Sequence, residues 1–186
     1  MIRSFDSTPV NQEWLDELCA QALWSPTAGN TAGVRMYTVG AHDVNEYFTV
    51  ATDAQWRATA RRAAGLRGAG AVVLITSRPQ DYEARYREPD KASSGLHERA
   101  AWTIPYWHTD AAMATMSLLL LLEESGWQAC LWGNFRHEVD VLHWAGVENE
   151  ELFASILVGR ADGHDVTSAS SRRDVLPRRE RVRRVP

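Results

Sequence analysis

The stretch from Ser25 to Asn30, which reads Ser-Pro-Thr-Ala-Gly-Asn, carries the groups with the clearest capacity for ligand chemistry. Thr27 offers a hydroxyl, Asn30 offers a carboxamide, and the turn adds backbone N–H groups. Together these groups suit an anionic or heteroaromatic ligand. Proline, glycine and asparagine are also the usual residues of turns. The stretch is therefore consistent with a ligand-binding loop and with a plain helix-to-strand turn.

Arginines near both ends of the chain could bind an anion. Arg3 lies close to the N-terminus, and Arg172 and Arg173 begin a segment, ending at Arg184, that holds seven arginines and two acidic residues. A guanidinium can hold a phosphate through two hydrogen bonds. A short basic tail is usually solvated, however. Both interpretations are kept for these residues.

Aromatic residues mark two further places in the chain. Tyr106, Trp107 and His108 precede a long apolar segment, where rings could stack on a planar substrate and the imidazole could act as a general acid. Packing inside the chain or at a subunit interface explains these three residues equally well. Trp132 and Gly133 end a short apolar run, and Trp132 is also consistent with a core aromatic. We find no nucleophile elbow, no His-x-x-x-His pair and no glycine-rich phosphate loop in the sequence.

The hydrophobic pattern predicts the elements that must position these groups. Asn11 is a suitable N-cap for a helix that runs to about residue 23. The long apolar segment should form a helix capped by Thr109 or Asp110, with Gly126 just past its end. Because that helix is apolar on nearly every side, it should be buried in the core or at a subunit interface. The other expected elements are strands at 34–39, 69–76, 128–132 and 153–158, helices at 52–64 and 138–144, and a polar excursion at 77–101.

Composition limits the classes of function. The 186 residues suit one domain, 1–186, with a basic tail at about 172–186, and a net charge of -4 gives no reason to expect nucleic-acid binding. Cys19 and Cys130 lie far apart in apolar surroundings and are expected to be buried thiols. The apolar run 117–122 is too short to span a membrane, and no signal peptide is apparent. We therefore expect a cytoplasmic protein without membrane association.

Taken in order, these pieces resemble the nitroreductase family of FMN-dependent oxidoreductases. The resemblance covers roughly residues 3–173 and is carried by Arg3-x-Phe5, the Pro-Thr-Ala-Gly-Asn loop, Trp132-Gly133 and the arginine pair after Ser171. The element pattern alone allows α+β or α/β. The resemblance implies the α+β class, with a central, mostly antiparallel sheet flanked by helices. It also implies an intertwined homodimer that holds FMN at its interface.

The resemblance also implies roles for individual residues. Arg3, Arg172 and Arg173 would hold the FMN phosphate. The loop would contact the flavin from the partner subunit through Pro26, Thr27, Ala28 and Asn30. Trp132 and Gly133 would lie beside flavin N5, which makes the Gly133 backbone the one catalytic candidate. The substrate side would be lined by Tyr106, Trp107 and His108. No metal site is expected.

The implied activity is ping-pong hydride transfer, from NAD(P)H through FMN to a nitroaromatic, quinone or enone. Two alternatives are kept. One is a flavin-dependent oxidase or dehydrogenase of natural-product biosynthesis, acting on a cyclic dipeptide or an azoline. The other is a non-catalytic flavin-binding protein. It is motivated by the absence of the Arg-Ser pair that the family places before Arg3 and by the absence of a matching carboxamide among residues 57–67. The biosynthetic alternative is instead favoured by Thr31-Ala32-Gly33, which stands where the family has Gln-Pro-Trp.

Overall fold

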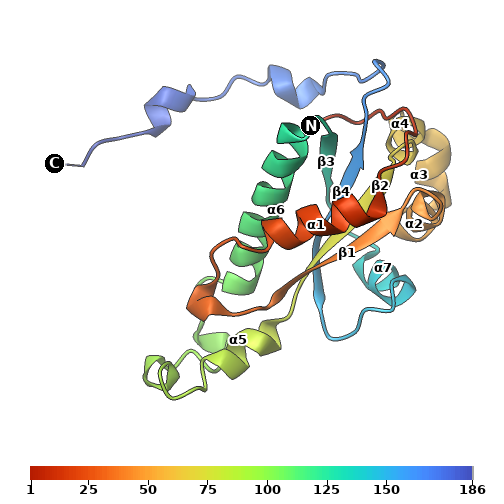
Figure 1. The fold of residues 1–186 in the computed structure, drawn as a ribbon. Coiled ribbons are helices and arrows are strands. Elements are labelled where there is room, and N and C mark those ends of the chain that lie inside the picture. The colour runs from red at the N-terminus through yellow and green to blue at the C-terminus, as the bar shows by residue number, and fades with distance from the viewer. Residues whose placement is uncertain (186) are drawn as a thin grey trace.

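A single antiparallel sheet organises the chain, and the computed structural model describes residues 1–185 of it. Its strands are β1 (Val34–Gly40), β2 (Ala71–Ser77), β3 (Gln128–Trp132) and β4 (Glu151–Gly159), in the order β1-β2-β4-β3 (Figure 1). Each pair of neighbours is antiparallel. The four strands predicted from the sequence are therefore confirmed. The fold is α+β with helices on both faces of the sheet, as predicted.

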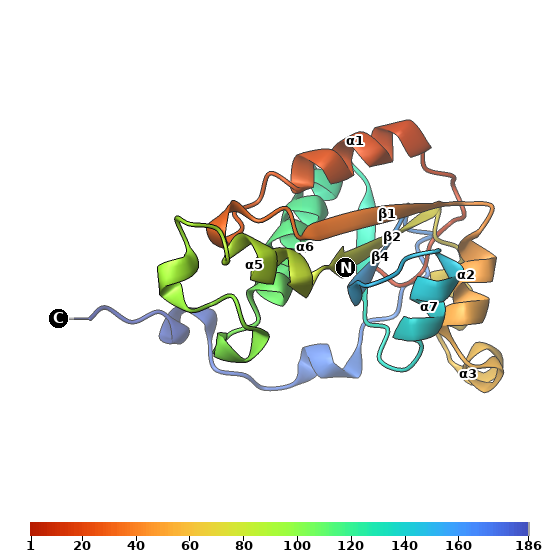
Figure 2. The same ribbon diagram turned by 90° about the horizontal axis from the view of Figure 1, so that it is seen from below.

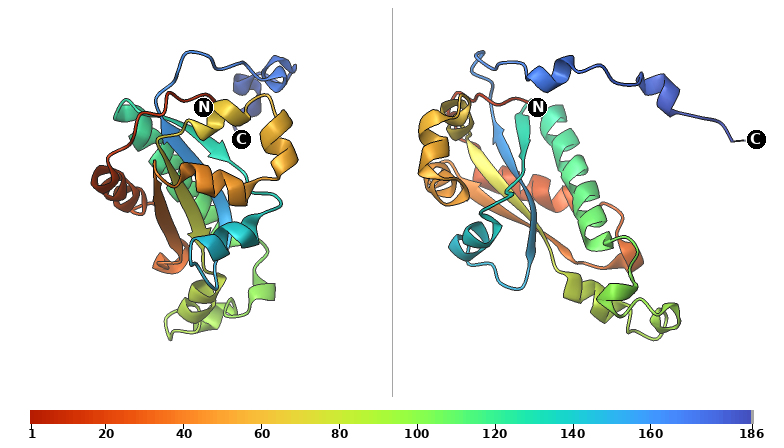
Figure 3. Two further views of the ribbon diagram at one scale, coloured as in Figure 1. Left: turned by 90° about the vertical axis from the view of Figure 1, so that its right-hand side faces the viewer. Right: turned by 180° about the vertical axis from the view of Figure 1, so that it is seen from behind.

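One face of the sheet is covered by α1 (Gln12–Ala22) and α6 (Tyr106–Glu124), as Figures 2 and 3 show from two further directions. The predicted cap of α1 is confirmed, because the Asn11 side chain accepts a hydrogen bond from the Trp14 N–H at 2.9 Å. The apolar side of α1 packs through Leu15, Leu18 and Ala22 against the sheet and α6.

The prediction for the start of α6 is wrong. The helix begins at Tyr106, directly after Pro105, so neither Thr109 nor Asp110 is its cap. Pro105 fits that place because proline cannot donate a helical backbone hydrogen bond. Gly126 follows the helix with a φ of 75°, as predicted. Burial is one-sided in the single chain, since Leu118 and Leu122 are fully covered whereas Met116 and Leu120 are 52% and 59% exposed.

The other face of the sheet carries α2 (Val44–Ala51), α3 (Ala54–Thr59), α4 (Ala63–Arg67) and α7 (Glu138–Trp144). The helix at 138–144 is confirmed, whereas the single helix predicted at 52–64 is wrong. Thr52 and Ala60 have extended backbones and divide the segment into separate helices. The apolar side of α2 recurs at helical spacing and packs into the core through Val44, Tyr47, Phe48 and Ala51.

Two segments leave the body of the fold. The polar stretch after β2 contains α5 (Pro79–Arg85) and two short 3₁₀ turns before α6 begins. The chain after β4 projects away from the sheet and both helical layers (Figures 1 and 3), with short 3₁₀ turns at Ala169–Arg172 and Arg178–Arg181. Pro186, the last residue of the predicted basic tail, lies outside the described residues. Within residues 1–185 no helix is long and apolar enough to cross a membrane.

Candidate functional site

Three arginines line a pocket of about 410 Å³ beside the N-terminal segment: Arg3, Arg61 and Arg62. The segment is held in place by backbone hydrogen bonds from the Ile2 N–H to the Ala129 carbonyl, at 3.2 Å, and from the Phe5 N–H to the Gly65 carbonyl, at 3.1 Å. A side chain at Gly65 would approach the Arg3 carbonyl to 2.8 Å. Glycine is therefore required for α4 to lie this close to Arg3.

The pocket is electropositive. Among residues 1–185, Arg3, Arg61 and Arg62 form no ion pair with a carboxylate, and the Arg62 guanidinium donates only to the Val166 carbonyl, at 2.8 Å. Burial raises the pKa of the Cys130 thiol at the pocket wall, while the nearby positive charges of Arg3 and Arg62 oppose that rise. Unpaired guanidinium groups around one cavity make a binding site for an anion such as a phosphate.

A second pocket, of about 530 Å³, adjoins the first and is aromatic. The two share Trp56, Leu131 and Trp132 in their walls. The Trp132 ring packs edge-on against Trp56 with centroids 5.3 Å apart, and its buried Nε1 has no hydrogen-bond partner within residues 1–185. The Phe135 ring is 92% exposed and lies over Gly133, where an added Cβ would come within 2.5 Å of it. The two pockets together form a trough with a cationic end and an aromatic end.

The predicted loop, Ser25–Asn30, is held through its backbone. The Asp110 carboxylate accepts hydrogen bonds from the Ala28 N–H and from the Tyr82 hydroxyl, both at 2.8 Å. Arg85 donates to the Gly29 carbonyl, also at 2.8 Å. Gly29 has a φ of 66° and lies flat against the Tyr86 ring, so a side chain there would be strained and would clash.

Two side chains of this loop remain available to a ligand, whereas the Ser25 hydroxyl is hydrogen-bonded to that of Ser117 at 2.8 Å. Thr27 and Asn30 form no side-chain hydrogen bond with any other part of residues 1–185. Asn30 has a φ of 57°, in the left-handed region that non-glycine residues rarely adopt. The loop therefore has a fixed backbone and two polar side chains that can bond to water or to a ligand, which fits both a ligand-binding loop and a plain turn.

The three predicted substrate residues lie at the start of α6, near the same loop. Trp107 is buried and carries the Arg99 guanidinium 5.0 Å above its ring, so it packs within the chain. Tyr106 is 39% exposed. The His108 Nε2 lies 2.7 Å from the Glu151 carboxylate, which Arg99 also contacts. Burial would raise the pKa of Glu151, but these two partners lower it below its usual value.

A single chain does not bring the predicted residues together. The trough lies beside α3 and α4, whereas the loop and the start of α6 lie beside α5, at the other end of the molecule (Figures 1 and 2). Arg172 and Arg173 are exposed on the projecting C-terminal segment. The predicted residues therefore lie in two separate regions of the chain: the trough, and the loop with the start of α6.

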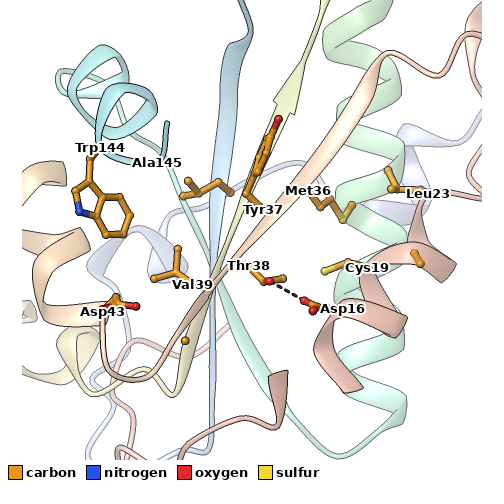
Figure 4. A pocket seen from close by; sticks show the side chains of 13 residues that line it. Asp16, Cys19, Leu23, Met36, Tyr37, Thr38, Val39, Asp43, Trp144 and Ala145 are labelled. Carbon is orange, nitrogen blue, oxygen red and sulfur yellow. Dashed lines mark hydrogen bonds between the residues drawn. The ribbon is translucent and has the colours of Figure 1, made fainter. Parts of the chain in front are cut away.

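A larger cavity than either pocket of the trough contains none of the predicted site residues. It has a volume of about 670 Å³ and runs along β1, an edge strand, between α1 and α7 (Figure 4). Its polar groups are partly engaged, since the Thr38 hydroxyl donates to Asp16 at 2.6 Å. Burial raises the pKa of the Cys19 thiol at its wall to about 12, which keeps that thiol protonated and unreactive near neutral pH. Size alone therefore does not identify the functional site.

Sequence reasoning missed Trp56, Arg61 and Arg62. They lie on or beside α3 and α4, in a polar segment that shows no motif. The available signal was the pair of adjacent arginines shortly after a tryptophan, between two predicted strands. No cluster of three or more potential metal ligands occurs in the described part of the chain.

The chain matches one protein-family model, and many solved structures have a similar fold. A family model described as "Nitroreductase family" matches residues 1–160. No curated protein matches the chain. An enone reductase of gut-bacterial fatty acid saturation is 16% identical, with a TM-score of 0.68 and coverage of 95% of this chain and 93% of its own. At this identity the likeness shows the fold.

Two further solved structures agree with this fold. One, described as a nitroreductase in complex with FMN, from Exiguobacterium sibiricum, is 14% identical, with a TM-score of 0.70 and coverage of 99% of this chain and 92% of its own. Another, described as an NAD(P)H:FMN oxidoreductase, from Staphylococcus epidermidis, is 17% identical, with a TM-score of 0.64 and coverage of 94% and 91%.

Proposed function

The chain belongs to the nitroreductase family, and on that premise we propose that it is an FMN-dependent oxidoreductase whose trough binds the cofactor. The observation that carries the proposal is that two pockets adjoin. One is lined by arginines that form no ion pair within residues 1–185, and the other is lined by aromatic rings. FMN has the matching chemistry, because an anionic phosphate and a planar ring system are joined in one molecule. The FMN complex of a protein with a similar fold supports the same assignment.

The residues of the trough fit the two ends of FMN. Arg3, predicted from the sequence, would hold the phosphate together with Arg61 and Arg62. Trp132 and Gly133 would lie beside the ring, since both residues line the aromatic pocket.

Bound FMN would supply the redox chemistry, as a two-electron carrier reduced by NAD(P)H and oxidised by the acceptor. The protein would bind and orient the reactants. Its aromatic walls would pack against the ring end, and its arginines would hold the phosphate end. The NAD(P)H:FMN oxidoreductase described above supports the choice of donor. The cytoplasmic location predicted from the sequence remains part of this proposal.

We further propose that two copies of the chain assemble each site. The loop of a second copy would present Thr27 and Asn30 to the cofactor, and the start of its α6 would form the substrate side with Tyr106 and His108. Two features support an intertwined homodimer. The C-terminal segment projects away from the sheet and its helices (Figure 3), and contact with a second copy would bring Arg172 and Arg173 near a phosphate. The uncovered side of α6 exposes apolar residues of the kind that subunit interfaces bury.

The acceptor is proposed to be an activated double bond, a quinone or a nitroaromatic. The enone reductase with a similar fold favours the first. The experiment is to purify the chain, add FMN, remove the unbound flavin by gel filtration, and assay the retained fraction with NADH or NADPH and one acceptor of each class. Retained flavin with donor-dependent turnover would support the proposal. No retained flavin would refute it, and flavin without turnover would favour the non-catalytic alternative.

A further inference from the structure

The short helix α3 is attached to the rest of the molecule in an unusual way. It has no buried residue, and it is flanked by residues with extended backbones, Thr52 and Asp53 before it and Ala60 after it. Extended residues at both ends can absorb a rotation of the helix between them, as hinge residues do. Within α3, Trp56 is the residue that packs against the core.

A single arginine ties α3 to its neighbour. The Arg57 guanidinium donates to the carbonyls of Phe48 and Thr49, at 3.4 and 3.0 Å, and to the Thr52 carbonyl, at the end of α2. The last carbonyls of a helix lack partners within the helix and carry partial negative charge, so a guanidinium is well placed there. Arg57 lies on α3 but lines neither pocket of the trough.

The preceding residue, Trp56, faces the trough. It lies in the shared wall of the cationic and aromatic pockets, and its half-buried ring packs edge-on against Trp132. A planar ligand entering the aromatic end must pack against this indole or displace it. A residue that served only the core would be covered by the core, whereas Trp56 borders both ends of the cavity.

We propose that Trp56 is a cofactor-positioning lid: α3 holds its indole against the bound flavin, and Arg57 latches α3 in the closed position. This inference rests on the proposed function, since it assigns a role within the same trough. The indole adds aromatic contact to the ring system and covers the trough where its two ends meet. Its effect is on the retention of FMN.

The test measures the dissociation constant and release rate of FMN for the wild type and four variants. Trp56→Ala and Trp56→Leu remove the aromatic plane and should weaken FMN binding about tenfold, the loss expected for one aromatic stacking contact. Trp56→Phe retains a ring and should stay within about threefold of the wild type. Arg57→Ala leaves the indole intact but opens the latch, so it should speed FMN release.

The matched control is Trp14→Ala. Trp14 is also on a helix and packs against another tryptophan, Trp127, with ring centroids 5.9 Å apart, but it lies on the opposite face of the sheet. The melting temperature of each variant is measured without FMN. A variant that melts at the wild-type temperature but binds FMN more weakly has lost binding and not its fold. If the wild type retains FMN and the Trp56 variants match Trp14→Ala, the lid is refuted and the proposed function stands. If the wild type binds no FMN, both are refuted.

Discussion

Asp110 shows how one residue can position a site that it does not line. Its carboxylate is fully buried, joins the loop, α5 and α6 through Ala28 and Tyr82, and has one oxygen without a partner. Burial raises its pKa, and the two hydrogen bonds only partly oppose that rise. From the sequence, Asp110 was predicted to be a helix cap, because aspartate is a common cap and precedes an apolar run. Its contact with Ala28 could not be predicted in this way, because the two residues lie far apart in the sequence.

The raised pKa of Asp110 gives a pH dependence with a definite sign. Between the ordinary aspartate value of 3.8 and its higher folded value, the folded state binds the proton more tightly than the unfolded state. The free energy of unfolding therefore falls as pH rises through that window. Asp110→Asn cannot titrate, so its unfolding free energy, measured with urea across this range, should rise relative to that of the wild type. A constant difference would contradict the account.

The three arginines of the trough should act through the phosphate. Alanine at Arg3, Arg61 or Arg62 should each weaken FMN binding about tenfold to a hundredfold, the range for losing a hydrogen bond to a charged group. Arg67→Ala is the control, because Arg67 lies on α4 but binds Asn45. Riboflavin lacks the phosphate, so its affinity should be the same for the wild type, the three alanine variants and the Arg67→Ala control. Fluorescence titration measures both affinities. Equal losses for both ligands would exclude phosphate binding.

At the scale of elements, the sequence predicted the sheet well and the helices between β1 and β2 poorly. Each strand is a compact apolar or alternating run, a pattern that persists in the fold. The segment 44–67 instead divides into three helices shorter than nine residues, and such helices depend on tertiary packing more than on their own pattern. One of these three short helices is α3, which carries Trp56 in the wall of the trough.

The Asn11 cap was predicted and confirmed, so its energetic effect can be measured. Asn11→Ala leaves the Trp14 N–H without its partner and should lower the free energy of unfolding by about 1 kcal/mol. Glu17→Ala, on the exposed side of the same helix, should change it by less than about 0.5 kcal/mol. Denaturant unfolding with an unchanged slope would measure both. Equal effects would show that the cap contributes nothing specific.

At the scale of the whole molecule, the sequence predicted site residues by their type, but it gave no information on where they lie in the fold. The predicted loop lies beside α5, at the opposite end of the molecule from the trough that contains Arg3, Trp132 and Gly133. The residue pattern of one chain does not show which surfaces of two copies would form an interface. The projecting segment and the exposed side of α6 carry that information only once the fold is known.

Removal of the basic segment tests its role in assembly. A chain ending at Ser171 lacks all seven arginines of that segment and should dissociate more readily into monomers and retain less FMN, while keeping its fold by circular dichroism. Sedimentation over a range of protein concentrations measures the dissociation. An unchanged dimer with unchanged FMN content would show that the segment is only a solvated tail.

The central claim is that FMN binds in a site completed by two chains. Sedimentation velocity of the FMN-loaded protein, recorded at both a protein and a flavin absorption wavelength, tests it most directly. We predict one boundary at the mass of two 20.9 kDa chains, with flavin and protein moving together. Flavin moving with a 20.9 kDa monomer, or remaining unbound, would contradict the account.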